Sequence, residues 1–153
     1  LTNNVMLGGH VDVGSRAYLA GAVAVHQFCR IGSFAMVGGL ARVRQDVPPF
    51  VTVDGGSTMV VGLNRVGMRR AGFDRAALAQ LKTAYQVIYR SGLPWEEMLA
   101  SLEEQFTTGP AAEFAPFFRI GNRGFVQERR TPPGATVRLV RSDPIDGARK
   151  LAS

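Results

Sequence analysis

The chain has 153 residues, of which 46% are hydrophobic and 20% are charged, and this composition suits a single folded domain of ordinary size. No apolar run approaches the roughly 18 residues of a membrane span, and no basic-then-apolar leader opens the sequence, so we expect a soluble, cytoplasmic protein. A net charge of +6 would attract an acidic protein, a phosphorylated ligand or nucleic acid without selecting among them, and one cysteine excludes an internal disulfide.

A repeat of six residues governs the first 48 positions. Every sixth residue from Leu1 to Val43 is aliphatic, and the position four further on, from Val5 to Val47, always carries a small side chain. An amphipathic helix would repeat near 3.6 residues and an ordinary strand at 2, so this period predicts a parallel β-helix with coils of about 18 residues. A sandwich of short strands is the weaker alternative, because its turns would be irregularly spaced.

Glycine recurs directly after the aliphatic residue of the repeat. A glycine in such a place either leaves room for a close approach of the backbone or adopts torsion angles that other residues avoid. Both explanations stay open for this column, which contains Gly8, Gly14, Gly32 and Gly38.

The stretch "VAVHQFCRI" raises the possibility of a reactive Cys/His pair. The register puts Cys29 in the small inward column between Val11 and Val47, where a thiol is a compact hydrophobe with no charged neighbour. His26 has the opposite parity to inward-facing Val25 and should point outward. The two side chains therefore diverge, and a zinc site is excluded as well, because two histidines and one cysteine do not supply a convergent ligand set.

The aliphatic column breaks at Pro49, within "QDVPPF". Two prolines remove two ladder donors, so we expect the coils to stop there. The following residues, 51–62, contain a Gly-Gly turn and are predicted to form an irregular connector.

Three helices are predicted after the connector, because the period changes and helix-capping residues appear. The first is capped by Asp74 and ends near Arg90, the second opens with Pro94, and the third starts near Pro110. Their apolar stripes should pack on one another and on the β-helix. From Glu128 the sequence is rich in proline, glycine and charge, and we expect disorder. The predicted organisation is coils in 1–50, a connector in 51–62, a helical domain in 63–127 and a tail in 128–153.

The order of five segments resembles a known family. Coils with "NNVMLGGHV" and "AVHQFCRIGSFAMVGG" precede "QDVPPF", "GLNRVGMRRAGF" and "AYQVIYRSG", as in the C-terminal half of bacterial UDP-N-acetylglucosamine O-acyltransferases. The resemblance covers about residues 1–127. It implies a left-handed parallel β-helix followed by a C-terminal α-helical domain, and a homotrimer with active sites between subunits.

The resemblance also implies a reaction. Members of the family transfer a 3-hydroxyacyl group from acyl carrier protein to the 3-hydroxyl of UDP-N-acetylglucosamine, the first step of lipid A biosynthesis. This chemistry calls for no metal or redox cofactor. The partners that we expect are acyl carrier protein, UDP-N-acetylglucosamine and further copies of the chain, with no nucleic acid and no membrane span.

Seven residues match functional positions of the family, and their roles come from the resemblance alone. Gly9 matches the glycine whose N–H faces the oxyanion, and a glycine suits close approach of the thioester. Gly39 matches a position at the base of the acyl channel. The remaining matches are His10 in the sugar pocket, His26 and Gln27 as substrate-binding residues, and Asn64 and Arg70 as nucleotide-binding residues.

Two features separate the chain from familiar members. Val66 stands where they often carry an acidic residue and Ser57 where they carry a histidine, so some nucleotide contacts should differ. The family's catalytic histidine lies in a coil ahead of Leu1, so the general base is absent from this chain. We therefore expect a fragment of a longer product that is a poor catalyst alone, because such a base contributes about 10²–10⁴-fold.

Two alternatives stay open beside the acyltransferase. A non-catalytic remnant that only trimerises or binds a sugar nucleotide would fit the absent base. A sister hexapeptide acyltransferase with another acceptor is disfavoured by "GLNRVGMRRAGF".

Overall fold

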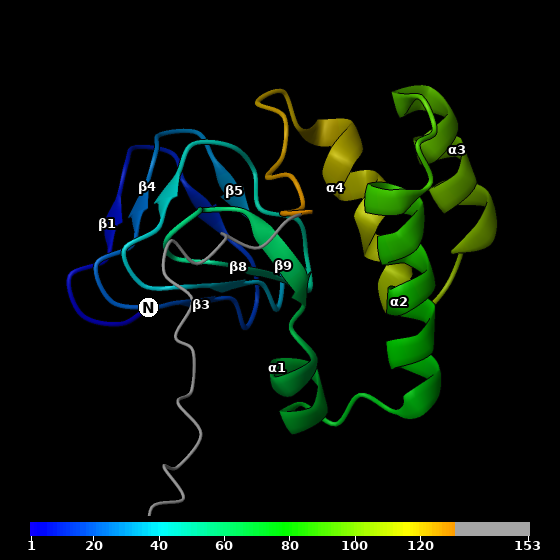
Figure 1. The fold of residues 1–153 in the computed structure, drawn as a ribbon, viewed down its shortest axis with the longest axis horizontal. Coiled ribbons are helices and arrows are strands. Elements are labelled where there is room, and N and C mark those ends of the chain that lie inside the picture. Colours follow the sequence, from blue (N-terminus) through cyan, green and yellow to red (C-terminus); the bar gives the residue numbers. More distant parts are fainter. Residues whose placement is uncertain (131–153) are drawn as a thin grey trace, which may run out of the picture.

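Short parallel strands at six-residue intervals form the first part of the computed structural model, which describes residues 1–130 (Figure 1). Strands 18 residues apart pair in register, as Leu7 with Val25 and Val25 with Val43. The predicted parallel coils are thereby confirmed. The first sheet contains β1 (Met6–Leu7), β4 (Ala24–Val25) and β7 (Arg42–Val43), the second contains β2 (Asp12–Val13) and β5 (Arg30–Ile31), and the third contains β3 (Tyr18–Leu19), β6 (Met36–Val37), β8 (Val51–Val53) and β9 (Val60–Leu63).

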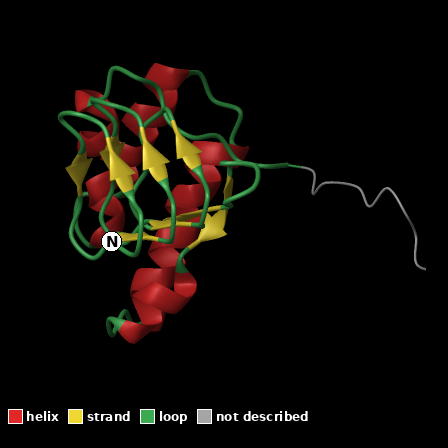
Figure 2. Ribbon diagram, turned by 90° about the vertical axis from the view of Figure 1, so that its left-hand side faces the viewer, coloured by secondary structure: helices red, strands yellow, loops and turns green. Residues whose placement is uncertain are grey.

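The aliphatic column of the repeat is the core of the coils. Leu19, Val37 and Val43 are fully buried, and the small column beside them, with Val23 and Ala35, is buried as well. Figure 2 shows the strands of successive coils side by side, with most of the helices beyond them. The three sheets therefore enclose one apolar interior, and in β1 to β7 the first residue of each strand is the more exposed one or is at least not buried.

The glycine column is explained by close approach of successive coils. A Cβ atom at Gly8 would lie 2.5 Å from the backbone nitrogen of Gln27, and the other three glycines of the column are equally crowded. Positive φ angles instead occur two residues further on, where His10 has φ +56° and Phe34 has φ +57°. The unusual torsions are thus adopted by non-glycine residues at the corners, and the glycines are needed for space.

The coils do not stop at the prolines, which corrects the prediction. Ile31 bridges Val47 in parallel, 16 residues on, and Val37 pairs with Val53 at the same shortened spacing. The last coil thus lacks two residues. Val47 therefore fills the large aliphatic column, not the small column beside Cys29, and Pro49 falls in a turn where no ladder donor is lost.

Residues 51–62 are not an irregular connector either. Strand β8 extends the third sheet in parallel from β6, and β9 turns back to pair antiparallel with β8. The two valines of β8 are buried and follow the shortened spacing of the last coil. They therefore belong to the same core as the aliphatic residues of the repeat. The Gly-Gly pair lies in the turn between the two strands.

The three predicted helices are confirmed, and one more precedes them. Asp74 caps α2 by accepting from the N–H of Ala77 at 2.8 Å, and Gly92 follows the helix with φ +69°. The short first helix was not predicted. The helices are α1 (Arg65–Arg70), α2 (Arg75–Arg90), α3 (Trp95–Gln105) and α4 (Phe114–Ile120), with a 3-10 turn η1 (Pro110–Glu113) before the last. None of the helices within residues 1–130 is long and apolar enough to cross a membrane.

Aromatic and aliphatic side chains join the helices to the coils. Phe50 of the last coil packs edge-on against Phe114 of α4 and lies in one buried cluster with Met68, Leu81 and Leu99. The predicted stripe of α2 also reaches the coils, because Tyr85 belongs to the buried cluster of the β-helix and Ile88 packs against it.

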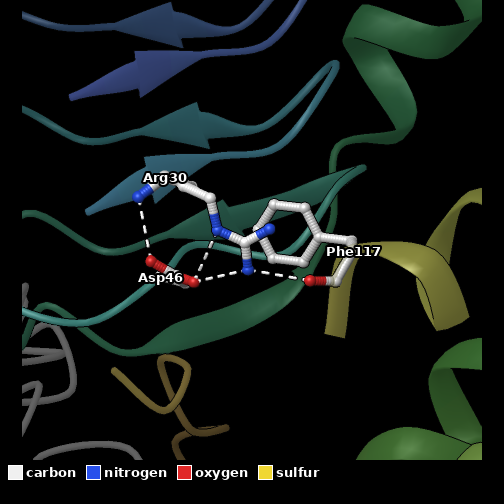
Figure 3. A network of polar contacts seen from close by, with 3 residues as sticks. All are labelled: Arg30, Asp46 and Phe117. Atoms are coloured by element: carbon white, nitrogen blue, oxygen red, sulfur yellow. Dashed lines mark hydrogen bonds and ion pairs between the residues drawn. The ribbon is translucent and has the colours of Figure 1, made fainter. Parts of the chain in front are cut away.

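A buried ion pair adds a polar link between the second sheet and α4 (Figure 3). Arg30 donates to Asp46 Oδ2 through Nε at 2.9 Å and through Nη2 at 2.6 Å, and its backbone N–H donates to Oδ1. Nη2 also donates to the carbonyl oxygen of Phe117 at 2.7 Å, and the guanidinium carbon lies 4.2 Å from the centroid of that ring. Asp46 is only 2% exposed, so its charge depends on Arg30 for compensation.

The start of the predicted tail is ordered. Glu128 bridges Val60 of β9, the backbone N–H of Arg129 donates to the Val60 carbonyl at 2.8 Å, and the Glu128 carboxylate accepts from Tyr85. The prediction of disorder from Glu128 onward is therefore wrong for 128–130. Residues 131–153 lie outside the described part of the chain.

Candidate functional site

A groove of about 670 Å³ runs between the outer face of the third sheet and α1. Outward side chains of three paired strands form one wall, and the first turns of α1 form the other. Asn64 and Arg70, which the resemblance gives as nucleotide-binding residues, both line this groove. The wall on the sheet side contains Tyr18, Met36 and Thr52, and the wall on the helix side contains Asn64, Val66, Gly67 and Arg70.

Asn64 determines where α1 begins. Its Oδ1 accepts from the N–H of Gly67 at 3.0 Å, which caps the helix, and its Nδ2 donates to the carbonyl oxygen of Phe34 at 2.8 Å. Its own N–H donates to Phe50 at 2.7 Å. The amide therefore ties the helix to a corner of the coils, and Arg70, six residues later, is held over the groove by this contact.

The groove is positively charged. Arg70 is exposed, and none of the ion pairs among residues 1–130 includes it. Arg16 lines the opposite side and lies over the Phe34 ring, 5.8 Å from its centroid. Among residues 1–130, no acidic side chain is part of the groove lining. Two guanidinium groups without a carboxylate partner suit an anionic ligand such as a phosphate.

The sequence reasoning did not identify Arg16. The repeat could have indicated it. Arg16 has the same hexad position as Phe34, and the shortened register adds Phe50 to that column, so the three side chains lie at one corner of successive coils. The two residues that depart from familiar members of the family, Val66 and Ser57, lie in different places. Val66 lines the groove, whereas Ser57 donates from N–H and Oγ to the Asp54 carboxylate in the turn before β9, and these bonds lower the pKa of Asp54.

Four predicted site residues lie together at the corner between the first and second sheets, which we call the first corner (Gly9, His10, His26, Gln27). All four are exposed. The His10 ring stacks on Phe28 with centroids 5.0 Å apart and an angle of 2° between the planes. A Cβ atom built at Gly9 meets nothing within 4 Å, so the fold does not require glycine there, in contrast to its neighbour Gly8.

Gly39 lies apart from both groups, at the corner between the third and first sheets. A Cβ atom there would approach the Gly21 carbonyl oxygen to 3.3 Å, so packing of adjacent coils alone accounts for a small residue. In one copy of the chain the predicted residues thus occupy three places. The three sheets form the sides of a triangular prism, and the first corner lies across this prism from the groove on the third sheet.

The Cys29 thiol is buried and His26 is exposed, so the two side chains diverge as predicted. The expectation that no charged group lies near the thiol is wrong. Burial raises the pKa of Cys29, and the Arg123 guanidinium acts in the opposite direction from beside it. Arg123 lies 94 positions later in the sequence, where no hexad pattern could indicate it. Within residues 1–130 no group of three or more histidine, cysteine, aspartate or glutamate side chains could hold a metal ion.

Comparison with known proteins finds a matching family model and named relatives. Residues 46–126 match a family model described as UDP N-acetylglucosamine O-acyltransferase, domain 2. A relative named acyl-[acyl-carrier-protein]–UDP-N-acetylglucosamine O-acyltransferase from Gloeothece citriformis is 46% identical over 67% of this chain and 37% of its own length. The relative of the same name from a Janthinobacterium species is 39% identical over 83% of this chain and 50% of its own length.

Solved structures of such proteins share the fold. The UDP-N-acetylglucosamine acyltransferase of Francisella novicida superposes with a TM-score of 0.78 at 32% identity, covering 84% of this chain and 48% of the other. The Arabidopsis protein of that name gives 0.75 at 38% identity, covering 82% and 47%. The chain therefore spans about half the length of the proteins that it matches.

Proposed function

Because this chain belongs to the UDP-N-acetylglucosamine O-acyltransferase family, we propose that it forms part of an enzyme that transfers a 3-hydroxyacyl group from acyl carrier protein to the 3-hydroxyl of UDP-N-acetylglucosamine, the first step of lipid A biosynthesis. The observation that carries the proposal is the groove, where Arg16 and Arg70 line a space to which the described part of the chain contributes no acidic residue. A cytoplasmic setting is part of the same proposal.

The groove would hold the nucleotide. A guanidinium can donate two parallel hydrogen bonds to oxygens of a diphosphate, and Arg70 has no competing ion pair among residues 1–130. Asn64 already uses its side-chain amide within the fold, so its main contribution would be to place α1, with any ligand contact coming from its remaining lone pair and proton.

The first corner would hold the reacting end of the sugar and the acyl thioester. The Gly9 N–H donates to no backbone carbonyl among the described residues, whereas its carbonyl accepts from Phe28 at 3.0 Å. This N–H is therefore available to an oxyanion at a site where no side chain blocks approach. His10 and Gln27 would orient the sugar hydroxyl that attacks the thioester carbonyl, with departure of the carrier thiol. We assign the general base to neither histidine of this chain.

Two copies of the chain would complete each site. The first corner and the groove lie on different sides of the prism, so one copy cannot bring them to one ligand. A left-handed β-helix homotrimer, as the resemblance implies, would set the corner of one copy against the groove of the next. Exposed apolar side chains on these surfaces support such contact, since Tyr18 is 48% and Phe28 53% exposed. Gly39 would border the acyl channel.

Basic residues of α1 and α2 would attract the acidic carrier protein. Arg65, Arg69, Arg75 and Lys82 are exposed on α1 and the first half of α2, and the first turns of both helices carry no acidic residue. Charge of one sign on one face raises the rate of encounter with a partner of opposite charge.

Mass measurement and ligand titration of the chain test the proposal. We expect sedimentation equilibrium to give three times the 16.5 kDa mass of the subunit, and calorimetry to detect saturable binding of UDP-N-acetylglucosamine. A monomer that binds no UDP-N-acetylglucosamine at millimolar concentration would contradict it.

A hybrid distinguishes the enzyme from the non-catalytic remnant. The half of the Janthinobacterium relative that this chain does not match is joined ahead of Leu1, and the product is incubated with 3-hydroxyacyl carrier protein and UDP-N-acetylglucosamine. Formation of 3-O-acylated product supports the enzyme, whereas a trimeric hybrid that binds the nucleotide and transfers nothing supports the remnant.

A further inference from the structure

Arg123 reaches the first corner from the far end of the described chain. It belongs to the segment after α4, and this segment pairs with the last coil: the N–H of Asp46 donates to the Gly124 carbonyl at 3.1 Å, and the N–H of Val126 donates to the Asp46 carbonyl at 2.9 Å. A parallel bridge between Asp46 and Phe125 completes the pairing. Asp46 of the coil thus holds the backbone directly after Arg123, and the Arg123 side chain lies at the corner.

The guanidinium of Arg123 contacts the imidazole of His26. Arg123 Nη2 lies 3.2 Å from His26 Nδ1. Arg123 Nε is buried and has no hydrogen-bond partner among the described residues, so the head group is partly withdrawn from water. An arginine side chain that only covered the surface would keep this atom solvated. Arg123 thus contacts His26 through Nη2, while its Nε is buried.

The two neighbours of His26 Nδ1 require opposite protonation states. A guanidinium can only donate, so a hydrogen bond from Arg123 requires Nδ1 to be unprotonated and puts the ring proton on Nε2. The carbonyl oxygen of Gln27, 3.1 Å from Nδ1, can only accept, and it favours the tautomer with the proton on Nδ1. The tautomer of His26 therefore depends on which of these contacts prevails.

We propose that Arg123 is a positioning residue for His26, which it holds in the Nε2–H tautomer with that N–H directed outward as a donor to an acceptor oxygen of the bound sugar nucleotide. The proposal deepens the proposed function and rests on it for the identity of the ligand. The tautomer itself is a property of the free chain. Without Arg123, the Gln27 carbonyl would draw the proton to Nδ1 and leave an acceptor, not a donor, facing the ligand.

Nitrogen NMR of the histidine rings tests the tautomer directly. The chain has only two histidines, so a ¹⁵N-labelled sample gives two sets of ring signals, and His10→Asn assigns them. Protonated and unprotonated ring nitrogens have well-separated chemical shifts. In Arg123→Met we expect the ratio of Nδ1–H to Nε2–H forms of His26 to rise about fivefold, the shift that loss of one ordinary hydrogen bond produces. Arg123→Lys keeps a donor and should restore most of the original ratio.

Two controls separate this effect from general loosening. His10 serves as an internal reference in each spectrum, and Arg119→Met removes an arginine of α4 that pairs with Glu96 and Glu103 and does not touch His26. The His10 signals should stay the same in Arg123→Met, and Arg119→Met should not change the His26 signals. An unchanged His26 ratio in a folded Arg123→Met chain would overturn the proposal.

Titration with UDP-N-acetylglucosamine then links the tautomer to binding. Arg123→Met should weaken binding, and adding it to His26→Ala should cause no further loss, because the two changes act through one contact. Full additivity would overturn the positioning role. If the unaltered chain binds no UDP-N-acetylglucosamine, the proposed function fails, while the NMR result still decides whether Arg123 selects the tautomer.

Discussion

Replacing Arg70 with alanine is expected to weaken UDP-N-acetylglucosamine binding by about 10- to 100-fold, the loss typical of charge-assisted hydrogen bonds to a phosphate. Arg70 lies in the last turn of α1, is exposed, and makes no ion pair among residues 1–130, so its removal should not disturb the fold. Calorimetric titration of the variant, with circular dichroism to confirm folding, measures the effect. Increasing salt should narrow the difference between variant and unaltered chain, because solvent ions screen the contact.

The neighbouring Arg69→Ala variant is the matched control. Arg69 lies in the same turn and is equally exposed, yet it does not line the groove. It should lower UDP-N-acetylglucosamine affinity only slightly. Equal losses from Arg69→Ala and Arg70→Ala would mean that net positive charge, not a specific contact, draws the ligand, and an unchanged affinity in Arg70→Ala would remove Arg70 from the site.

Replacing Arg30 with methionine is expected to destabilise the chain by about 3–5 kcal/mol, because it leaves a buried carboxylate without its partner. Asp46 would lose the bonds from Arg30 Nε and Nη2, and Phe117 of α4 would lose both a donor and the guanidinium over its ring. Chemical denaturation followed by circular dichroism gives the free energy of unfolding. The loss should exceed that of any surface ion pair, since Asp46 is 2% exposed.

Two further variants define the source of this loss. Arg119→Met removes exposed ion pairs with Glu96 and Glu103 and should cost far less, because solvent screens exposed charges. The double variant Arg30→Met/Asp46→Leu removes both charges of the pair and should recover much of the stability that Arg30→Met loses. If Arg30→Met is no worse than Arg119→Met, the pair does not fasten the coils to α4.

The coils were predictable because a period of six leaves a regular trace in the sequence. The columns from Leu1 to Val43 identify both inward positions of each hexad, and the structure buries them accordingly from Leu19 onward. The end of the coils was predicted wrongly for a physical reason. Two residues are missing before Val47, so the column continues on a shorter spacing that a fixed period of six cannot follow.

The candidate site was only partly predictable. Asn64 and Arg70 were assigned from the resemblance, and the groove brings them together. The bonds from Asn64 to the coils depend on where Phe34 and Phe50 lie, and no local pattern encodes that. Arg16 and Arg123 were missed because each meets residues that are distant in the sequence. Arg16 lies on a coil facing α1, and Arg123 lies on a segment 97 positions after His26.

The central claim is that each site combines the first corner of one copy with the groove of its neighbour, and subunit mixing tests it most directly. Gln27→Ala impairs the corner and Arg70→Ala impairs the groove, so each variant alone should bind UDP-N-acetylglucosamine poorly. If the two are co-refolded in equal amounts, about one site in four should combine an intact corner with an intact groove and recover full affinity. Calorimetry of the mixture should then show about a quarter of the original tight sites. A mixture of confirmed mixed trimers with no tight sites would contradict the claim.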